Sequence, residues 1–145
     1  MSDPANLIIH TIRLSPGEDL RLAVEAACKQ LMADKDCQAA CVISSVGSLS
    51  CAVLRYAAEP GGSRIEGPLE MITLSGTLAA PGGGGVHLHA SVADAQGRVT
   101  GGHLMPGCIV RTTAEIVLAL LPGWSFVRTL DPATGFRELA ARRRA

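Results

Sequence analysis

The sequence predicts an α+β protein, built from an antiparallel β-sheet with one flanking helix near the N-terminus. A helical hydrophobic period occurs once, up to about residue 34, and from residue 38 onward side chains follow the period of two that is typical of strands. Connections between the predicted strands are short, which favours antiparallel pairing of neighbours. The 145 residues fit a single domain. We expect it to span residues 1–145, with a core at about 7–139 and a basic tail at 140–145.

The N-terminal elements are a strand and the helix. Residues 7–14 are rich in the β-branched side chains that strands favour. The segment that follows resembles a capping box, with Ser15 as N-cap, Pro16 in the first turn and Glu18 reaching back to the cap. The helix should then run to about Asp34. Its apolar face is formed by Leu20, Val24, Ala27, Cys28, Leu31 and Met32.

The remainder reads as strands separated by turn residues. We predict strands at residues 39–46, 49–57, 69–78, 86–92, 108–121 and 124–130, and another beginning at Val99. Gly47-Ser48 and the polar loop 59–64 act as separators. The glycine run at 81–85 is either a flexible connector or a backbone that approaches a ligand closely.

Composition narrows the function classes. Basic and acidic residues both total 13, so the chain lacks the net positive charge that drives non-specific DNA binding. Aromatic residues make up 3%, which leaves few platforms for stacking nucleic-acid bases. No apolar run approaches the roughly 18 residues of a membrane-spanning helix, and the N-terminus has no apolar signal segment. We expect a cytoplasmic protein that does not enter membranes.

The five cysteines have no CxxC spacing and are odd in number. Reduced, buried thiols are the interpretation that agrees with a cytoplasmic location. The alternative interpretation is that Cys37 and Cys41 are metal ligands, but no second pair of ligands follows at zinc-finger spacing.

Two histidines dominate the predicted strand at 86–92. His87 and His89 are two residues apart, so both imidazoles project from one face of a strand. The alternate residues are all apolar and form the core face. Cβ atoms two residues apart are separated by roughly 6.5 Å, which lets two ring nitrogens converge on one metal ion.

The position of His103 depends on the register of the next hairpin. If the loop has three residues, with Gly97 in the left-handed conformation, Asp94 pairs with Arg98 and His103 lies opposite His89. Any other loop length shifts the register by one residue and turns His103 to the other face. In the first case His87, His89 and His103 form an open site of the zinc type. The other interpretation is a hydrogen-bonded structural set, and the isolated His10 is better explained as a structural or solvated residue.

Polar residues interrupt the predicted strand at 108–121. Arg111 and Glu115 either pair with each other or take part in a site. In a site, Glu115 would be a metal ligand, a hydrogen-bond acceptor for a histidine or a general base, and Arg111 would clamp a carboxylate. The arginines of the tail form either a frayed, solvated terminus or a contact for an anionic partner.

Together these segments resemble the plants-and-prokaryotes-conserved (PPC) domain family over nearly the whole chain. The resemblance is carried in order by Pro16-Gly17-Glu18-Asp19, Val46-Gly47-Ser48-Leu49, Leu74-Ser75-Gly76-Thr77, His87-Leu88-His89, Gly101-Gly102-His103-Leu104, Thr113-Ala114-Glu115-Ile116 and Thr134-Gly135. It implies a stand-alone domain that assembles as a homotrimer. The chain has no AT-hook, the short arm that carries minor-groove binding in plant members. The fold and the three-histidine motif are also similar to those of acetolactate decarboxylase, a zinc enzyme.

Three functions from different classes follow. The favoured one is a trimeric module that binds a divalent metal, zinc first, through His87, His89 and His103. Its biological role is left open, with regulation as one option. The second is a metal-dependent lyase or hydrolase for a small acidic metabolite, with Glu115 as acid/base and Arg111 as clamp. The third is weak, non-specific DNA binding.

Overall fold

The structure is a computed structural model that describes residues 6–145, which form one helix and eight strands. The elements in chain order are β1 (Ile8–Leu14), α1 (Leu20–Asp34), β2 (Ala39–Arg55), β3 (Ser63–Ala79), β4 (Val86–Ala93), β5 (Val99–Leu104), β6 (Ile109–Leu120), β7 (Trp124–Leu130) and β8 (Arg137–Arg143). Within these residues no helix is long and apolar enough to span a membrane.

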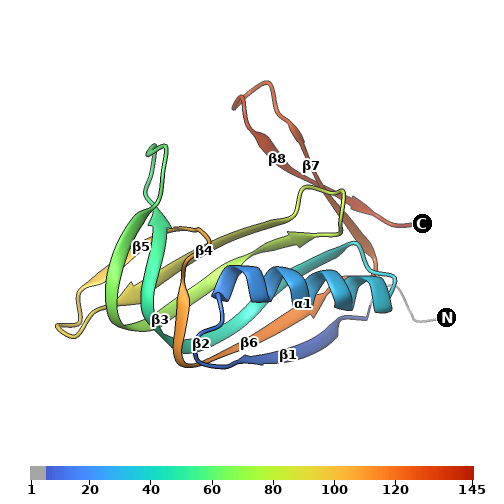
Figure 1. Ribbon diagram of the computed structural model, residues 1–145. Helices are drawn as coiled ribbons and strands as arrows, with labels where there is room; N and C mark the ends of the chain where they lie inside the picture. Colours follow the sequence, from blue (N-terminus) through green and yellow to red (C-terminus); the bar gives the residue numbers. More distant parts are fainter. Residues whose placement is uncertain (1–5) are drawn as a thin grey trace.

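Six strands form one antiparallel sheet in the order β1-β6-β2-β3-β4-β5 (Figure 1). The end of β2 also pairs with β5, through Leu54 with Leu104 and Arg55 with His103. This second pairing closes β2, β3, β4 and β5 on themselves, so one end of the sheet is barrel-like. The predicted antiparallel sheet with one helix is therefore confirmed.

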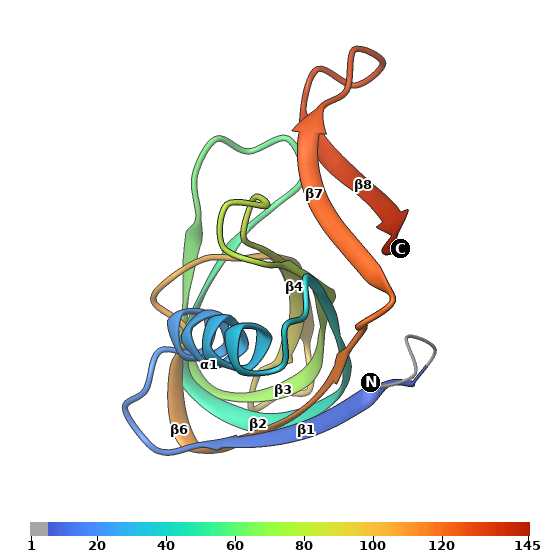
Figure 2. The same cartoon turned by 90° about the vertical axis from the view of Figure 1, so that its right-hand side faces the viewer.

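The helix fills the concave side of the sheet, as the end-on view shows (Figure 2). Its buried residues are Leu20, Val24, Cys28 and Met32, four apart along the chain. They pack against buried strand residues such as Leu88, Leu118 and Leu120 in one apolar core. The opposite face of the sheet is left to solvent or to another chain.

The helix begins later than the capping box predicts. Asp19 is the N-cap, and its side chain accepts a hydrogen bond from Leu22 N at 3.1 Å. Glu18 does reach back, since its Oε2 accepts from Ser15 N at 2.6 Å. However, Gly17 has φ +88° and donates to Val110 O at 2.9 Å, which ties this segment to the sheet rather than to the helix.

Gly47-Ser48 does not separate two strands, because β2 continues through it with shifts of register on both sides. A Cβ atom at Gly47 would lie 2.5 Å from Thr113 O, so the glycine permits a close approach of β6 instead of a turn. Likewise β3 begins at Ser63, within the loop predicted at 59–64. A Gly-Ser pair inside a long strand and the same pair in a turn look alike in sequence.

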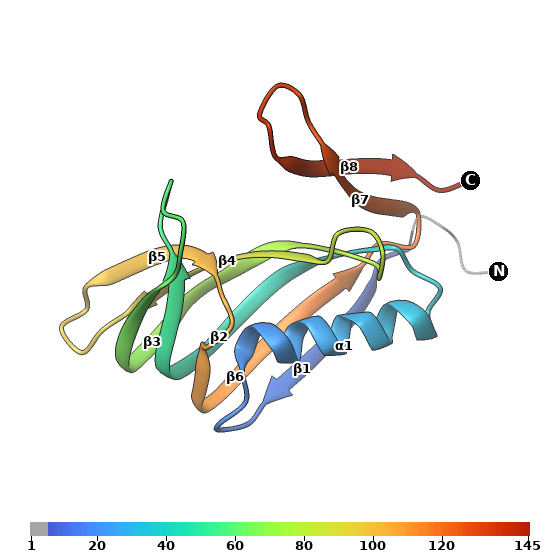
Figure 3. The same ribbon diagram turned by 45° about the horizontal axis from the view of Figure 1, so that its top comes forward.

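The basic tail is not a frayed terminus. Strand β8 (Arg137–Arg143) pairs along its full length with β7, and the two form a hairpin that projects from the sheet (Figures 1 and 3). Arg144 then donates to Asp36 O at 2.6 Å. The loop between β2 and β3 projects on the same side of the molecule as this hairpin (Figure 3).

Candidate metal centre

His87 and His89 lie on β4, which is hydrogen-bonded to β3 on one side and β5 on the other. Leu88 between them is fully buried and Ala90 is nearly so. The alternation expected from the sequence is therefore present: Leu88 and Ala90 pack in the core, and both imidazoles lie on the opposite face of β4.

The hairpin between β4 and β5 has the register that the three-residue loop predicts. Asp94 N donates to Arg98 O at 3.0 Å, and Gly97 has φ +76°. The Asp94 carboxylate also accepts from Gln96 N and Arg98 N, which fixes the turn. His103 is consequently the partner of His89, and the prediction that the three histidines share a face is confirmed.

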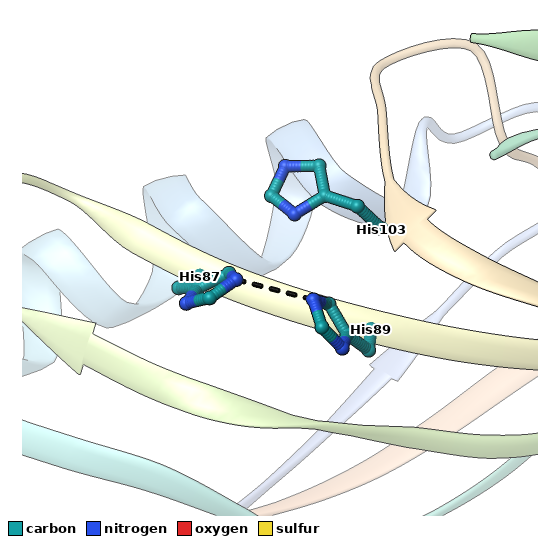
Figure 4. A group of neighbouring side chains, drawn as sticks. All are labelled: His87, His89 and His103. Atoms are coloured by element: carbon teal, nitrogen blue, oxygen red, sulfur yellow. Dashed lines mark hydrogen bonds between the residues drawn. The ribbon is translucent and has the colours of Figure 1, made fainter. Parts of the chain in front are cut away.

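The three rings converge on one point (Figure 4). Nε2 of His87 lies 3.1 Å from Nε2 of His89, and one ligand nitrogen from each histidine lies within 4.8 Å of the others. Two nitrogens bound to one tetrahedral zinc ion are about 3.3 Å apart. The pair on β4 already has this spacing, and His103 needs a side-chain movement of about 1.5 Å to reach it.

The two nitrogens of His103 have different surroundings. Nε2 lies 3.3 Å from Nη1 of Arg21 on α1, and a guanidinium can only donate, so Nε2 accepts this bond. Nδ1 is buried and has no hydrogen-bond partner among residues 6–145. A buried polar nitrogen without a partner costs free energy. A metal ion shared with the two neighbouring imidazoles would supply the missing partner of Nδ1. With Nε2 as acceptor, Nδ1 carries the ring proton. A metal at Nδ1 would require this proton to move to Nε2, so the Arg21–His103 hydrogen bond would be lost, whereas the 2.6 Å bond from Arg21 to Leu104 O would not be affected.

The environment keeps two of the rings neutral. Burial lowers the pKa of His103 to about 4, with the positive charges of Arg55 and Arg21 as further causes. The pKa of His87 is lowered by burial and then by Arg128. Neutral imidazole is the form that binds metals, so at neutral pH these two side chains are ready to act as ligands.

Sequence reasoning missed the arginines around the histidines. Arg55 on β2 is the register partner of His103, so it lies on the face that carries the histidines. Arg128 on β7 donates from Nη2 to Thr77 Oγ1 at 3.1 Å. The glycine run positions Arg128, because Arg128 N donates to Gly83 O at 2.7 Å and a Cβ atom at Gly84 would lie 2.7 Å from Arg128 Cβ. The run therefore serves packing against β7, which only the fold reveals.

Two adjoining cavities border the histidines. One, of about 420 Å³, is lined by His87, His103, Arg55, Arg128, Phe136 and Arg137, among others. The other, of about 610 Å³, is lined by His89, His103, Arg55, Tyr56, Glu59 and Phe136, among others. These volumes suit small organic ligands.

Glu115 and Arg111 are not brought to the histidines within one chain. Both are exposed on β6, which is separated from β4 by β2 and β3, a distance of roughly 14 Å across the sheet. The register partners of Glu115 are Arg13 and Val46. The two residues do not pair with each other either, since they stand about 13 Å apart along the strand.

The cysteines lie outside the site. All five are free, and four of them are buried. Burial raises the pKa of Cys28 to about 12 and that of Cys108 to about 11, so both remain thiols at neutral pH. Among residues 6–145, the histidine trio is the group whose positions suit a metal, and Cys37 and Cys41 are not in it.

The fold and the site together define the class: a small α+β domain with three histidines on the outer face of a curled antiparallel sheet. The chain belongs to the Plants and Prokaryotes Conserved (PCC) domain family, whose model matches residues 1–122. This confirms the resemblance to the family also written PPC.

Known relatives differ widely in size. The bifunctional protein GlmU of Synechococcus sp. strain JA-2-3B'a(2-13) is 48% identical over 136 residues, which is 94% of this chain and 20% of the relative. The chain thus spans about a fifth of that protein's length. A hypothetical protein from Salmonella enterica has a similar structure, with 35% identity, a TM-score of 0.87 and 97% of each chain covered. The metal-containing protein AF0104 from Archaeoglobus fulgidus is 26% identical, with a TM-score of 0.70 over 92% of this chain and 93% of its own.

More distant structures share the fold alone. The α-acetolactate decarboxylase of Bacillus subtilis is 15% identical, with a TM-score of 0.52 over 77% of this chain and 51% of that enzyme. A candidate DNA-binding protein from Ralstonia eutropha JMP134 is 23% identical, with a TM-score of 0.72 over 97% of this chain and 94% of its own. Both likenesses agree with the architecture that the sequence predicts.

Proposed function

We propose that this chain is a metal-binding protein in which His87, His89 and His103 hold a divalent cation, zinc first. The observation that carries the proposal is the convergence of three imidazoles, one of them with an unpaired buried nitrogen. Three neutral nitrogen ligands leave a coordination position open to water or to a further ligand. The metal-containing protein of Archaeoglobus fulgidus, which has the same fold, supports the proposal.

The test is metal analysis of protein purified without a histidine tag, followed by calorimetric titration with Zn²⁺. We expect one ion per chain for the wild type. His87→Ala and His89→Ala should each abolish stoichiometric binding without unfolding the protein, because their side chains lie outside the apolar core. His10→Ala is the matched control, since His10 lies on β1 away from the cluster.

The assembly proposed with this site is a homotrimer. The sheet face away from the helix carries apolar side chains that a single chain leaves uncovered, including Ile9 at 54% and Val46 at 56% exposure. Contact with further copies would cover them. Light scattering at micromolar concentration should give about three times the chain mass of 15.0 kDa. A monomer mass would contradict this assembly.

A second function is favoured by the cavities beside the histidines, and it is a metal-dependent lyase or hydrolase acting on a small acidic metabolite. The bound metal would supply Lewis-acid chemistry, and the arginines that line the cavity would orient a carboxylate. Within one chain β2 and β3 separate Glu115 and Arg111 from the histidines, so their proposed catalytic roles require a neighbouring copy to bring β6 to the site. Loss of turnover in Glu115→Gln with the metal retained would support the role of Glu115.

A further inference from the structure

The hairpin β7–β8 lies beyond the residues matched by the family model, and it contributes Arg128, Phe136 and Arg137 to the cavity at the histidines. We propose that this hairpin makes the metal centre a binding site for a small organic anion, a carboxylate or phosphoryl group on an apolar or aromatic body. We further propose that the anion and the metal bind cooperatively. The inference rests on the proposed metal site.

Positive charge gathers at the cavity from separate parts of the chain. Arg55 comes from β2, while Arg128 and Arg137 come from the hairpin, and Arg21 approaches His103 from α1. Among residues 6–145, no carboxylate forms an ion pair with any of these four guanidinium groups. Glu138 also lines the cavity, and its single negative charge stands against the three positive charges of Arg55, Arg128 and Arg137. The cavity is therefore net positive before a metal enters.

Cations beside guanidinium groups repel each other, and the repulsion is strong where water is partly excluded. An anion between the metal and the arginines removes this repulsion and gains charge-assisted hydrogen bonds. Each ligand then raises the affinity of the other by the same factor, as thermodynamic linkage requires. The three histidines and the arginines without ion-pair partners are thus most stable when the metal ion and the anion are both bound.

Aromatic side chains flank the same cavities. Phe136 borders both cavities and is 72% exposed, although apolar side chains of this size are usually buried. Tyr56, which is 37% exposed, lines the larger cavity together with His89. These are two of only four aromatic residues in the chain. Their position next to the arginines indicates a ligand whose charged end is joined to a planar or apolar body.

A small molecule fits these features better than a nucleic acid. The charges line a cavity of about 420 Å³ instead of an extended ridge, and the chain as a whole has no net charge. A DNA backbone is bound by charges spread along a surface, with affinity that depends steeply on salt.

The experiment is calorimetric titration of Zn²⁺-loaded full-length protein with benzoate, phenyl phosphate and the neutral benzyl alcohol. We expect benzoate or phenyl phosphate to bind at least about tenfold more tightly than benzyl alcohol. Whichever of these two anions binds more tightly shows whether the site prefers a carboxylate or a phosphoryl group. Arg55→Gln and Arg128→Gln should each weaken the binding of that anion by about tenfold or more, as loss of a charge-assisted bond implies. Arg142→Gln, an exposed arginine on the same hairpin, is the matched control and should match the wild type.

Further arms test the coupling and the aromatic contact. Saturating anion should raise the Zn²⁺ affinity of the wild type but not that of the double variant Arg55→Gln/Arg128→Gln. Phe136→Ala should weaken benzoate more than acetate. Arg128→Lys checks for misfolding, because it retains the charge and should retain part of the binding.

Stoichiometric Zn²⁺ binding with no preference for the anions over benzyl alcohol, or with unchanged affinity in both arginine variants, would overturn the inference but leave the metal site intact. Absence of Zn²⁺ binding would overturn the proposed function and the coupling, while arginine-dependent binding of benzoate to the metal-free protein would still support the anion site. Competition by a short random DNA duplex, lost in the same variants, would overturn the assignment to a small molecule.

Discussion

Gly76 lies on β3, next to the strand that carries His87 and His89. Adding one methyl group there, in Gly76→Ala, should disturb the metal centre. Gly76 pairs with Leu88, the residue between His87 and His89. A Cβ atom at Gly76 would overlap the carbonyl oxygen of His87, which belongs to the backbone and cannot rotate away. In Gly76→Ala, β3 and β4 must therefore separate locally, and the two histidines move with β4.

The size of the effect follows from the overlap. Forcing a methyl group into a close-packed position costs typically 1–3 kcal/mol. For a domain of this size, 1 kcal/mol corresponds to roughly 3 °C in Tm, so we expect a fall of about 3–10 °C. The affinity for Zn²⁺ should fall as well, since metal ligands must be held to about 0.5 Å.

The assay is thermal unfolding followed by circular dichroism, together with Zn²⁺ titration at a temperature at which the variant is folded. Gly61→Ala is the matched control, because a Cβ atom at Gly61 would meet nothing within 4 Å. A Gly76→Ala protein with the Tm and Zn²⁺ affinity of the control would refute the claim that the β3–β4 contact holds the histidines in place.

Three further predictions concern pH, nucleic acid and the outer face. Because the pKa of His103 is lowered to about 4, the unfolded chain takes up a proton near pH 6.5 while the folded chain does not. The metal-free fold should thus lose stability as the pH falls from about 6.5 to about 4, and His103→Gln should reduce that loss in thermal melts. Binding to random duplex DNA at physiological salt should be no tighter than ~10⁻⁵ M, and a gel shift showing salt-resistant, sequence-selective binding would contradict this. Glu115→Gln should leave Zn²⁺ affinity unchanged, because two strands, β2 and β3, separate Glu115 on β6 from β4 in the sheet; a loss of tens-fold would show that it is a ligand.

Local rules were sufficient to predict the shared face of His87 and His89, and they gave the position of His103 on condition that the loop has three residues. The alternation around Leu88 gives the face of His87 and His89, and the turn from Asp94 to Arg98 gives the register of His103. Both signals act over a few residues, so they can be read from the sequence without knowledge of the fold.

The arginines of the site could not be predicted in this way. Arg55 meets His103 only because the end of β2 pairs with β5, a contact between strands far apart in sequence. Arg128 comes to the cavity through a hairpin whose second strand, β8, has the sequence RELAARR, in which apolar and polar residues do not alternate. Arg111 and Glu115 were predicted as site residues because polar side chains interrupt an apolar strand. Within one chain they are exposed on β6, apart from the histidines, so their predicted roles depend on contact with another copy, which the sequence of one chain does not reveal.

The position of β8 also decides how the terminal arginines should be tested for DNA contacts. A truncation after Leu139 would remove about half of β8 together with the charges. Arg142→Gln and Arg143→Gln are the better variants, since they remove charge and retain the backbone pairing with β7.

The central claim is that the three histidines form one metal site, and Zn²⁺ titration at about pH 7.5 tests it most directly, because imidazoles are mostly neutral there. The wild type and His10→Ala should each bind one ion per chain, whereas His87→Ala, His89→Ala and His103→Ala should fail to do so while keeping the circular dichroism spectrum of a folded protein. Wild-type protein that stays metal-free in excess Zn²⁺, or histidine variants that bind as well as His10→Ala, would contradict the account.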